Sequence, residues 1–145
     1  MLLAPPLLLA ALATLGPWEL TLPVEGLKDE DLCVGDTLRA GQALIQAVQP
    51  RLPCLKLAIK FDDPGMVKRF LDSGRWGVYF KVLEEGAVKA GDAVAWVDRD
   101  PGRYPVPALG RLRFAAVRPA AEVERVLSLK ALPPEWRVRF SSLKA

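Results

Sequence analysis

The middle of the chain alternates apolar and polar residues in short runs, as half-buried β-strands do. Two such runs, residues 32–39 and 42–48, are separated only by Ala40 and Gly41. A glycine at the second position of a two-residue connection supplies a positive φ, so we predict a β-hairpin here. Two further runs, residues 77–83 and 93–97, predict two more strands.

The prolines around these runs set limits on strand pairing. Pro50 and Pro53 follow the hairpin, and neither can donate a hydrogen bond to a neighbouring strand. We therefore expect regular pairing to stop there. A shorter alternating run, residues 18–24, predicts one additional strand before the hairpin.

Residues 62–74 carry the clearest helix signals. Asp63 is a suitable N-cap, Pro64 fits the first helical position, and Gly74 stands where a left-handed residue ends a helix. The helix has an apolar face and should pack on another element. That face consists of Met66, Val67, Phe70 and Leu71.

The last third of the chain changes character. Residues 99–114 are rich in proline, glycine and arginine, and we interpret them as a linker or irregular arm. Residues 119–129 and 133–143 each begin with proline and space their apolar residues as helices do, which predicts two short helices packed together. Their apolar faces are Val123, Val126 and Leu127, and Trp136, Phe140 and Leu143. The expected fold is mostly β with an inserted helix (α+β, barrel-like), plus a small C-terminal helical appendage.

The first 15 residues are apolar and resemble a signal peptide, ending in the small-x-small pattern of residues 11–13. No lysine or arginine precedes the run, and Pro5 and Pro6 interrupt it. The run is also too short to span a bilayer as a helix. We expect a cytoplasmic protein without membrane partners, with export as the alternative.

Composition excludes several chemistries. The 145 residues contain no histidine and no asparagine, and their net charge is +3. Histidine-based triads, histidine-ligated zinc and haem are therefore excluded. The basic balance suits an anionic ligand, but no basic run is interleaved with aromatic residues, so we expect no nucleic-acid partner. Scarce amides fit a thermophile or a GC-biased genome.

The two cysteines, Cys33 and Cys54, form no CxxC pattern. Cys54 follows Pro53 and should sit at the start of a helical turn, where free backbone N–H groups favour a thiolate. Arg51 and Lys56 flank it and could bind an anion. The alternative is that Cys54 is a buried, inert side chain, as many cysteines are. For Cys33, in an apolar run, we favour that second interpretation.

The surroundings of Cys54 resemble the MOSC domain, named for the C-terminal domain of molybdenum cofactor sulfurase. Residues 120–140 further resemble the end of the three-helix extension of stand-alone bacterial members. The matching residues are Gln49-Pro50-Arg51, Pro53-Cys54, Lys56-Leu57, Gly74-Arg75, Gly77, Tyr79, Gly86 and Gly91-Asp92. An upstream Val34-Gly35-Asp36 resembles the family's turn of that sequence.

The resemblance implies a function for these residues. Cys54 would be the catalytic residue, as thiolate ligand to the metal of the molybdenum cofactor (molybdopterin) or as a sulfur carrier. Arg51 and Lys56 would neutralise the phosphate of the pterin, and Arg75 and Tyr79 would help to line the pocket. Some relatives reduce N-hydroxylated substrates with electrons from a partner, so an electron-donor or sulfur-donor protein is the expected partner. Pyridoxal phosphate belongs to the separate sulfurase module of the family.

The chain departs from the family pattern upstream, where relatives carry further barrel strands and a His-Gly-Gly segment. We therefore expect an N-terminally truncated, partial barrel: an apolar segment at 1–17, a partial MOSC domain at 18–98, and a linker with helical extension at 99–145. The alternative function is a degenerate remnant that acts only as a binding or structural protein. A nucleic-acid module is the third hypothesis.

Overall fold

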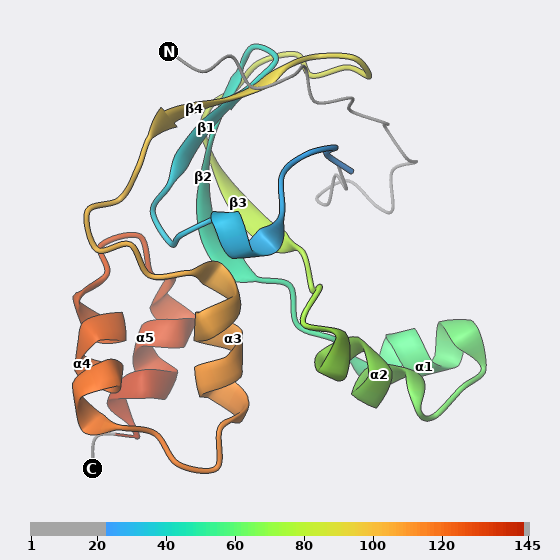
Figure 1. Cartoon of the computed structure of the whole chain (residues 1–145), viewed down its shortest axis with the longest axis vertical. Helices are drawn as coiled ribbons and strands as arrows, with labels where there is room; N and C mark the ends of the chain where they lie inside the picture. Colours follow the sequence, from blue (N-terminus) through green and yellow to red (C-terminus); the bar gives the residue numbers. More distant parts are fainter. Residues whose placement is uncertain (1–22, 144–145) are drawn as a thin grey trace.

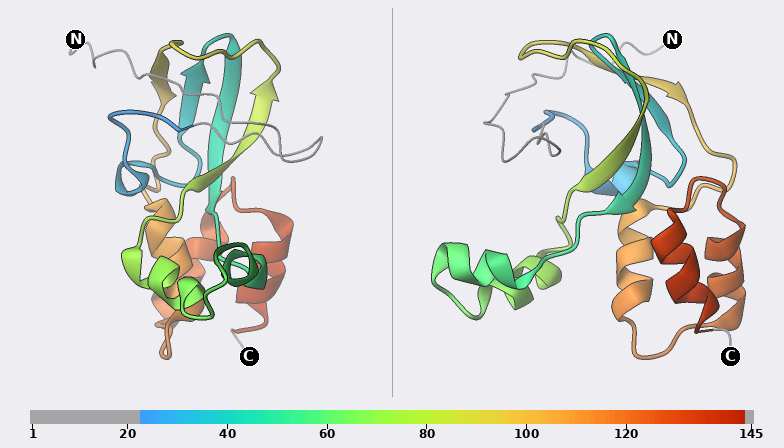
Figure 2. Two further views of the ribbon diagram at one scale, coloured as in Figure 1. Left: turned by 90° about the vertical axis from the view of Figure 1, so that its right-hand side faces the viewer. Right: turned by 180° about the vertical axis from the view of Figure 1, so that it is seen from behind.

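The computed structural model describes residues 23–143, so most of the strand predicted at 18–24 lies outside the described residues. Its centre is a curved antiparallel sheet with strand order β3-β2-β1-β4 (Figures 1 and 2). The strands are β1 (Thr37–Ala40), β2 (Ala43–Pro50), β3 (Val78–Glu84) and β4 (Val94–Asp98). In the described part of the chain β3 and β4 form the edges of this sheet. The fold is α+β, as predicted.

The predicted hairpin is present as β1 and β2, with Gly41 at a φ of 55° in the connection. Two boundaries were predicted wrongly. Strand β2 continues through Pro50, which pairs with Val78 at its end, because a terminal proline still offers its carbonyl group. Strand β1 starts at Thr37 rather than at residue 32.

A tight turn at residues 33–36 accounts for the late start of β1. The buried carboxylate of Asp36 accepts hydrogen bonds from the backbone N–H groups of Cys33 and Asp100, at 2.9 and 2.8 Å. Gly35 has a φ of 97°, and a Cβ there would collide with the Asp100 side chain. The Val-Gly-Asp sequence therefore has a structural role: it joins the start of the sheet to the segment after β4. Just before it lies a single 3-10 turn, η1 (Asp29–Asp31).

Two short helices, α1 (Leu55–Phe61) and α2 (Met66–Ser73), connect β2 to β3 and project from the sheet (Figure 1). The α2 helix is the predicted one, and Gly74 ends it at a φ of 64°. Its start was predicted wrongly, because Gly65 is the N-cap. Asp63 instead accepts a hydrogen bond from the Gly65 N–H at 2.8 Å, in a turn that precedes the helix.

The C-terminal extension has three helices: α3 (Val106–Phe114), α4 (Ala120–Ser128) and α5 (Pro134–Ser141). The last two were predicted, but the interpretation of residues 99–114 as a linker was wrong. Pro107 lies in the first turn of α3, where its missing N–H costs nothing. Gly110 lets α3 approach Trp76 so closely that a Cβ would collide with the indole ring.

One hydrophobic core joins the sheet to the extension, and α3 packs against β2. The core takes residues from both parts: Leu32, Val34, Leu38, Ala47, Tyr104, Val106, Leu109, Leu112, Val123, Val126, Leu129, Leu132, Trp136 and Phe140. Leu143, predicted to belong to the same face as Trp136 and Phe140, is exposed instead because α5 ends before it. Within residues 23–143, none of the helices is long and apolar enough to cross a membrane.

Candidate functional site

The candidate site lies where β2 and β3 leave the sheet. Their pairing continues for one residue beyond the strands, because the Arg51 N–H donates to the Gly77 carbonyl at 3.0 Å. The Gly77 N–H in turn donates to the Asp29 carboxylate at 2.8 Å. From this point one segment runs out through Cys54 into α1, and the other returns from α2 through Arg75. Four of the five sequence-predicted residues, Arg51, Cys54, Lys56 and Arg75, thus lie in α1 or in the two segments that carry the α1–α2 hairpin (Figure 1).

Cys54 is the N-cap of α1, as the preceding proline predicted, with extended backbone angles (φ −125°, ψ 168°). Its thiol is free and exposed, and it makes no side-chain capping hydrogen bond. The alternative that Cys54 is buried is therefore wrong. A reagent, a metal centre or a sulfur donor can reach this sulfur from solvent.

Cys33 has the opposite environment. It is 5% exposed and pairs with Pro105 in an isolated bridge, rather than lying in a continuous strand as predicted. Burial, and second the negative charge of Asp36, raise the pKa of the Cys33 thiol above its ordinary value. The protein therefore holds one buried thiol and one accessible thiol.

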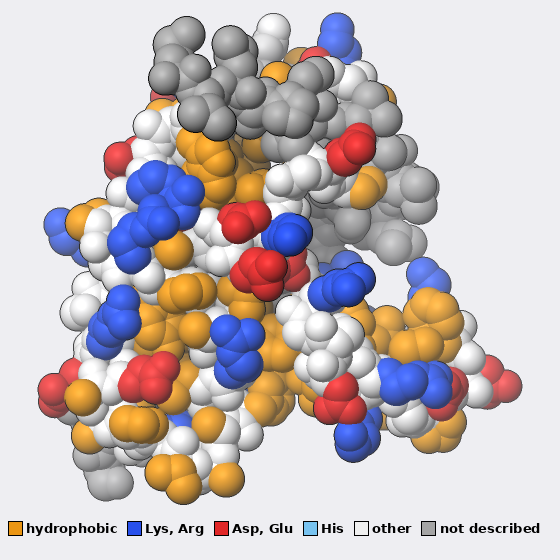
Figure 3. All heavy atoms as spheres, viewed as in Figure 1, with side chains coloured by type: hydrophobic (Ala, Val, Ile, Leu, Met, Phe, Trp, Pro, Cys, Tyr) orange, Lys and Arg blue, Asp and Glu red, His pale blue; other side chains and the backbone are white. Residues whose placement is uncertain are grey.

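Three predicted cations lie on the outgoing and returning segments. Arg51, Lys56 and Arg75 are all exposed, and none of them forms an ion pair within the described residues. Figure 3 shows basic, acidic and hydrophobic side chains mixed over the α1–α2 hairpin, at the lower right of the view, and two of its cations, Lys68 and Arg69, are paired with Asp72 and Asp63. The unpaired charges of Arg51, Lys56 and Arg75 can attract an anionic group to the region of Cys54.

Tyr79 has a different environment. It pairs with Gln49 across β2 and β3 and lines a cavity of about 320 Å³ between the sheet and the extension. The other residues of that cavity are Gln49, Pro50, Leu52, Arg113, Glu135, Trp136 and Arg139. Arg51, Cys54, Lys56 and Arg75 do not line it. The structure thus groups four predicted residues at the hairpin and places the fifth in a neighbouring cavity.

The sequence did not indicate the rest of this cavity. Arg113 comes from α3 and Arg139 from α5, and only the packing of the extension against β2 brings them to Gln49. No local spacing signals such a cluster. The one available hint was the density of arginine in residues 99–114, which we had interpreted as a feature of a linker.

The donor set around Cys54 fits a cofactor that brings most of its own ligands. Within residues 23–143 no group of three or more acidic or cysteine side chains could hold a bare metal ion. A single accessible thiolate can occupy one position on a soft or intermediate metal. The nearby free cations can offset the charge of a phosphorylated organic ligand. The residues are therefore compatible with molybdopterin, held by Cys54 and by Arg51, Lys56 and Arg75.

Sequence comparison identifies several relatives of this chain. The chain is 38% identical over 123 residues to "Uncharacterized protein YflK" of Bacillus subtilis, covering 85% of this chain and 56% of YflK. It is 36% identical over 78 residues to "Protein YiiM" of Escherichia coli, covering 54% of this chain and 35% of that protein. A third relative, "Reductase" of Gibberella moniliformis, is 32% identical over 92 residues, which are 63% of this chain and 16% of the reductase.

Solved structures show the same fold. The crystal structure of YiiM from Geobacillus stearothermophilus superposes with a TM-score of 0.81 at 35% identity, over 86% of this chain and 64% of that one. The E. coli YiiM structure gives a TM-score of 0.79 at 27% identity, over 86% and 62%. The chain thus spans between about half and two thirds of YflK and of these YiiM structures. The profile of the MOSC domain matches residues 21–95, a segment that contains Cys54 and all the other predicted site residues. This protein belongs to the MOSC domain family.

Proposed function

We propose that this protein binds the molybdenum cofactor and that Cys54 is its thiolate ligand to the metal. The observation that carries the proposal is the exposed, unpaired thiol at the head of α1, in the segment that matches the MOSC profile. When bound, the cofactor supplies the redox chemistry. The protein supplies a soft sulfur ligand at a fixed point of its backbone and cations for the phosphate.

Each residue has a defined task in this proposal. Cys54 gives up its proton on binding, since the thiolate is the ligand form. Arg51 can hold a phosphate oxygen pair with its planar fork, and Lys56 adds a point charge from the first turn of α1. Arg75 offers a further cation from the returning segment. Gly77, with a φ of 80° and its N–H bonded to Asp29, fixes the close approach of the two segments.

The relative called "Reductase" favours reduction over sulfur carriage as the use of the site. Reduction requires electrons from outside this chain, so the proposal includes an electron-donor protein as partner. Reducible N-hydroxylated compounds remain the proposed substrate class. Sulfur carriage at Cys54 is the competing use, and it predicts a persulfide rather than bound metal.

The test is the molybdenum content of the protein after expression in cells that make the cofactor. Wild-type protein should copurify with molybdenum, and Cys54→Ser should lose most of it. Cys33→Ala is the matched control, because it removes the other thiol without touching the site, and it should keep its molybdenum. Equal molybdenum in wild type and Cys54→Ser would refute the ligand role. A persulfide on Cys54 without metal would favour sulfur carriage.

A further inference from the structure

The α1–α2 hairpin carries Cys54 but has almost no core of its own. Its two helices pack mainly on each other, and of their residues only Ala58 is buried. Figure 2 shows the hairpin projecting away from the sheet. Because so few apolar contacts hold the hairpin, its position must be set by the bonds made where it joins the rest of the chain.

The first of these bonds comes from Asp29, a half-buried residue of η1. Its carboxylate accepts a hydrogen bond from the Gly77 N–H at 2.8 Å, and the Gly77 carbonyl accepts one from the Arg51 N–H at 3.0 Å. A carboxylate makes a stronger acceptor than a neutral carbonyl group does. One side chain therefore joins three segments: the turn before the sheet, the segment leaving β2 and the segment returning to β3.

The turn that carries Asp29 is itself fixed to the far edge of the sheet. Arg99, which follows β4, donates to the Asp31 carbonyl at 2.9 Å. The same guanidinium group forms an ion pair with the buried Asp36 carboxylate at 3.1 Å. Asp29 therefore holds the hairpin from a turn whose place is already determined by the sheet.

The second connection is made by Trp76, which is only 5% exposed. Its ring packs directly on the backbone of α3 at Gly110, where a Cβ would collide with it. Its indole N–H donates to the carbonyls of Phe70 and Leu71, both at 3.1 Å. These carbonyls belong to the last four residues of α2, which have no partner within the helix. Trp76 therefore joins the end of α2 to α3.

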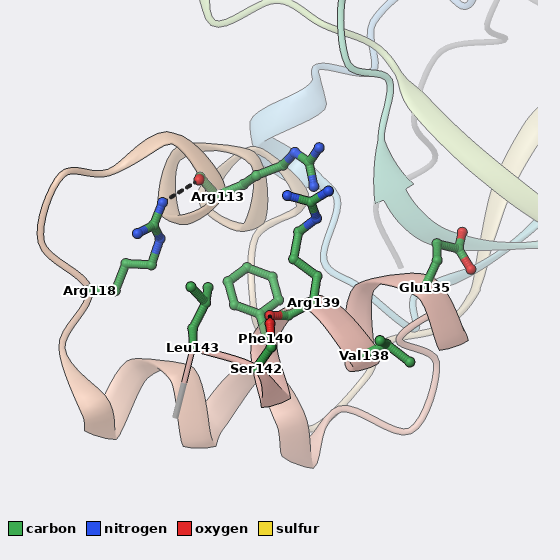
Figure 4. Close-up of a pocket in the computed structure, with 8 residues that line it drawn as sticks. All are labelled: Arg113, Arg118, Glu135, Val138, Arg139, Phe140, Ser142 and Leu143. Carbon is green, nitrogen blue, oxygen red and sulfur yellow. Dashed lines mark hydrogen bonds between the residues drawn. The ribbon is translucent and has the colours of Figure 1, made fainter. Parts of the chain in front are cut away.

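The α3 helix is a firm base for this connection. Leu109 and Leu112 are buried in the core that the sheet and the extension share. The Arg118 side chain donates to the carbonyls of Leu112 and Arg113 at 3.0 and 2.8 Å and so completes the end of the helix, as Figure 4 shows for Arg113. The hairpin is thus attached at one point to the sheet and at another to the shared core.

We propose that Asp29 and Trp76 are the positioning residues of the Cys54 site. Asp29 fixes the root of the hairpin, and Trp76 fixes the end of α2 directly after Arg75. Together they hold Cys54 and Arg75 in one arrangement relative to the sheet. Neither acts by touching a ligand, because the Trp76 ring is buried and the Asp29 carboxylate would repel an anion. The inference rests on the proposed function for the choice of Cys54 as the working group, but the arrangement can be measured without the cofactor.

Native-state hydrogen exchange of the molybdenum-free chain, followed by NMR, tests the role of Asp29. Asp29→Ala should speed exchange of the Gly77 amide by roughly tenfold to a hundredfold, as loss of a hydrogen bond to a charged group does. Asp29→Asn keeps an acceptor oxygen and should retain most of the protection. Glu30→Ala removes an exposed carboxylate of the same turn and should match wild type. Equal acceleration at Gly77 and throughout α3 would mean that Asp29 only stabilises the fold, and would overturn the proposal.

Electron–electron distance measurements between two spin labels test the arrangement itself. One label is placed on Cys54 and the other on Ala121→Cys, at an exposed position of α4, in a Cys33→Ala background. The parent protein should give one narrow distance distribution. Asp29→Ala and Trp76→Phe, which keeps an aromatic ring but lacks the N–H, should broaden it, whereas the two control variants should not. A distribution that stays narrow in both Asp29→Ala and Trp76→Phe would overturn the proposal.

Molybdenum content connects the arrangement to the site. After expression in cells that make the cofactor, folded Asp29→Ala should carry less molybdenum than Asp29→Asn, which should be close to wild type. Full retention of molybdenum by Asp29→Ala would overturn the positioning role. If wild type itself carried no molybdenum, the proposed function would fail, and the exchange and spin-label results would still decide this inference.

Discussion

The two helical parts of this protein are built in opposite ways. In the α1–α2 hairpin only Ala58 is buried, and large apolar side chains such as Leu55 and Ile59 are more than 70% exposed. In the three-helix extension, Leu109, Val126 and Phe140 are fully buried in the core shared with the sheet. The thiol of the candidate site is on the first part. The extension shares the buried core of the sheet, whereas the hairpin leaves Cys54 and its neighbouring cations exposed to solvent.

The largest expected contrast is between core and hairpin truncations. Phe140→Ala should lower the free energy of unfolding by about 3 to 5 kcal/mol, because it leaves a cavity in the shared core. Ile59→Ala should change it by less than about 0.5 kcal/mol, because the side chain is 74% exposed. Urea unfolding measures both. Similar losses in the two variants would contradict the contrast between hairpin and extension.

Gly110→Ala tests the close contact between α3 and the segment before β3. The added methyl group would collide with the Trp76 ring, so we expect a loss of about 1 to 3 kcal/mol in the same urea experiment. Gly65→Ala is the control in the hairpin. Its φ is −78°, and an added Cβ would lie 3.2 Å from the Asp63 carboxylate oxygen, a milder contact than that with the Trp76 ring, so we expect a smaller loss. If Gly110→Ala were as stable as wild type, α3 would not be in close contact with the Trp76 ring.

A smaller effect is expected from alkaline pH on the buried core. Burial, and second the hydrogen bond to Glu122, raise the pKa of Tyr104, and burial also raises the pKa of Cys33. The unfolded chain therefore releases these protons at lower pH than the folded protein does. Stability should be unaffected below the ordinary pKa values of 9.0 and 10.0 and should fall as pH rises above them. The fall should be smaller in Tyr104→Phe, and an unchanged pH profile in that variant would contradict this assignment.

The smallest effect on stability is expected at Cys54, where the contrast appears in reactivity instead. A thiol reagent such as 5,5′-dithiobis(2-nitrobenzoate) should modify Cys54 in the folded protein and Cys33 only after unfolding. Cys54→Ser should change the free energy of unfolding by less than about 0.5 kcal/mol. Fast modification of two thiols per folded chain would mean that the region around Cys33 opens readily.

Much of the sheet could be predicted because its signals are local. Alternation predicted the strands at 77–83 and 93–97 to within one residue of β3 and β4. Pro53 predicted Cys54 as the start of a helix. The failures have long-range causes. The α3 helix contains proline and glycine, and its stability comes from burial against β2 and Trp76 rather than from its own propensity.

The candidate site was only partly predictable for the same reason. Arg51, Cys54 and Lys56 follow one another along the chain, so a short motif identifies them. The cavity beside Tyr79 instead depends on how α3 and α5 pack against the end of β2, and residue spacing carries no signal of that packing. Arg113 and Arg139 could therefore be found only from the folded structure.

The central claim, that Cys54 ligates molybdenum, is tested most directly by selenium X-ray absorption. Selenocysteine would replace Cys54 in a Cys33→Ala background, in protein loaded with the cofactor. The account predicts a molybdenum neighbour in the selenium spectrum, at bonding distance. A spectrum with only carbon around selenium, in protein that contains molybdenum, would contradict it.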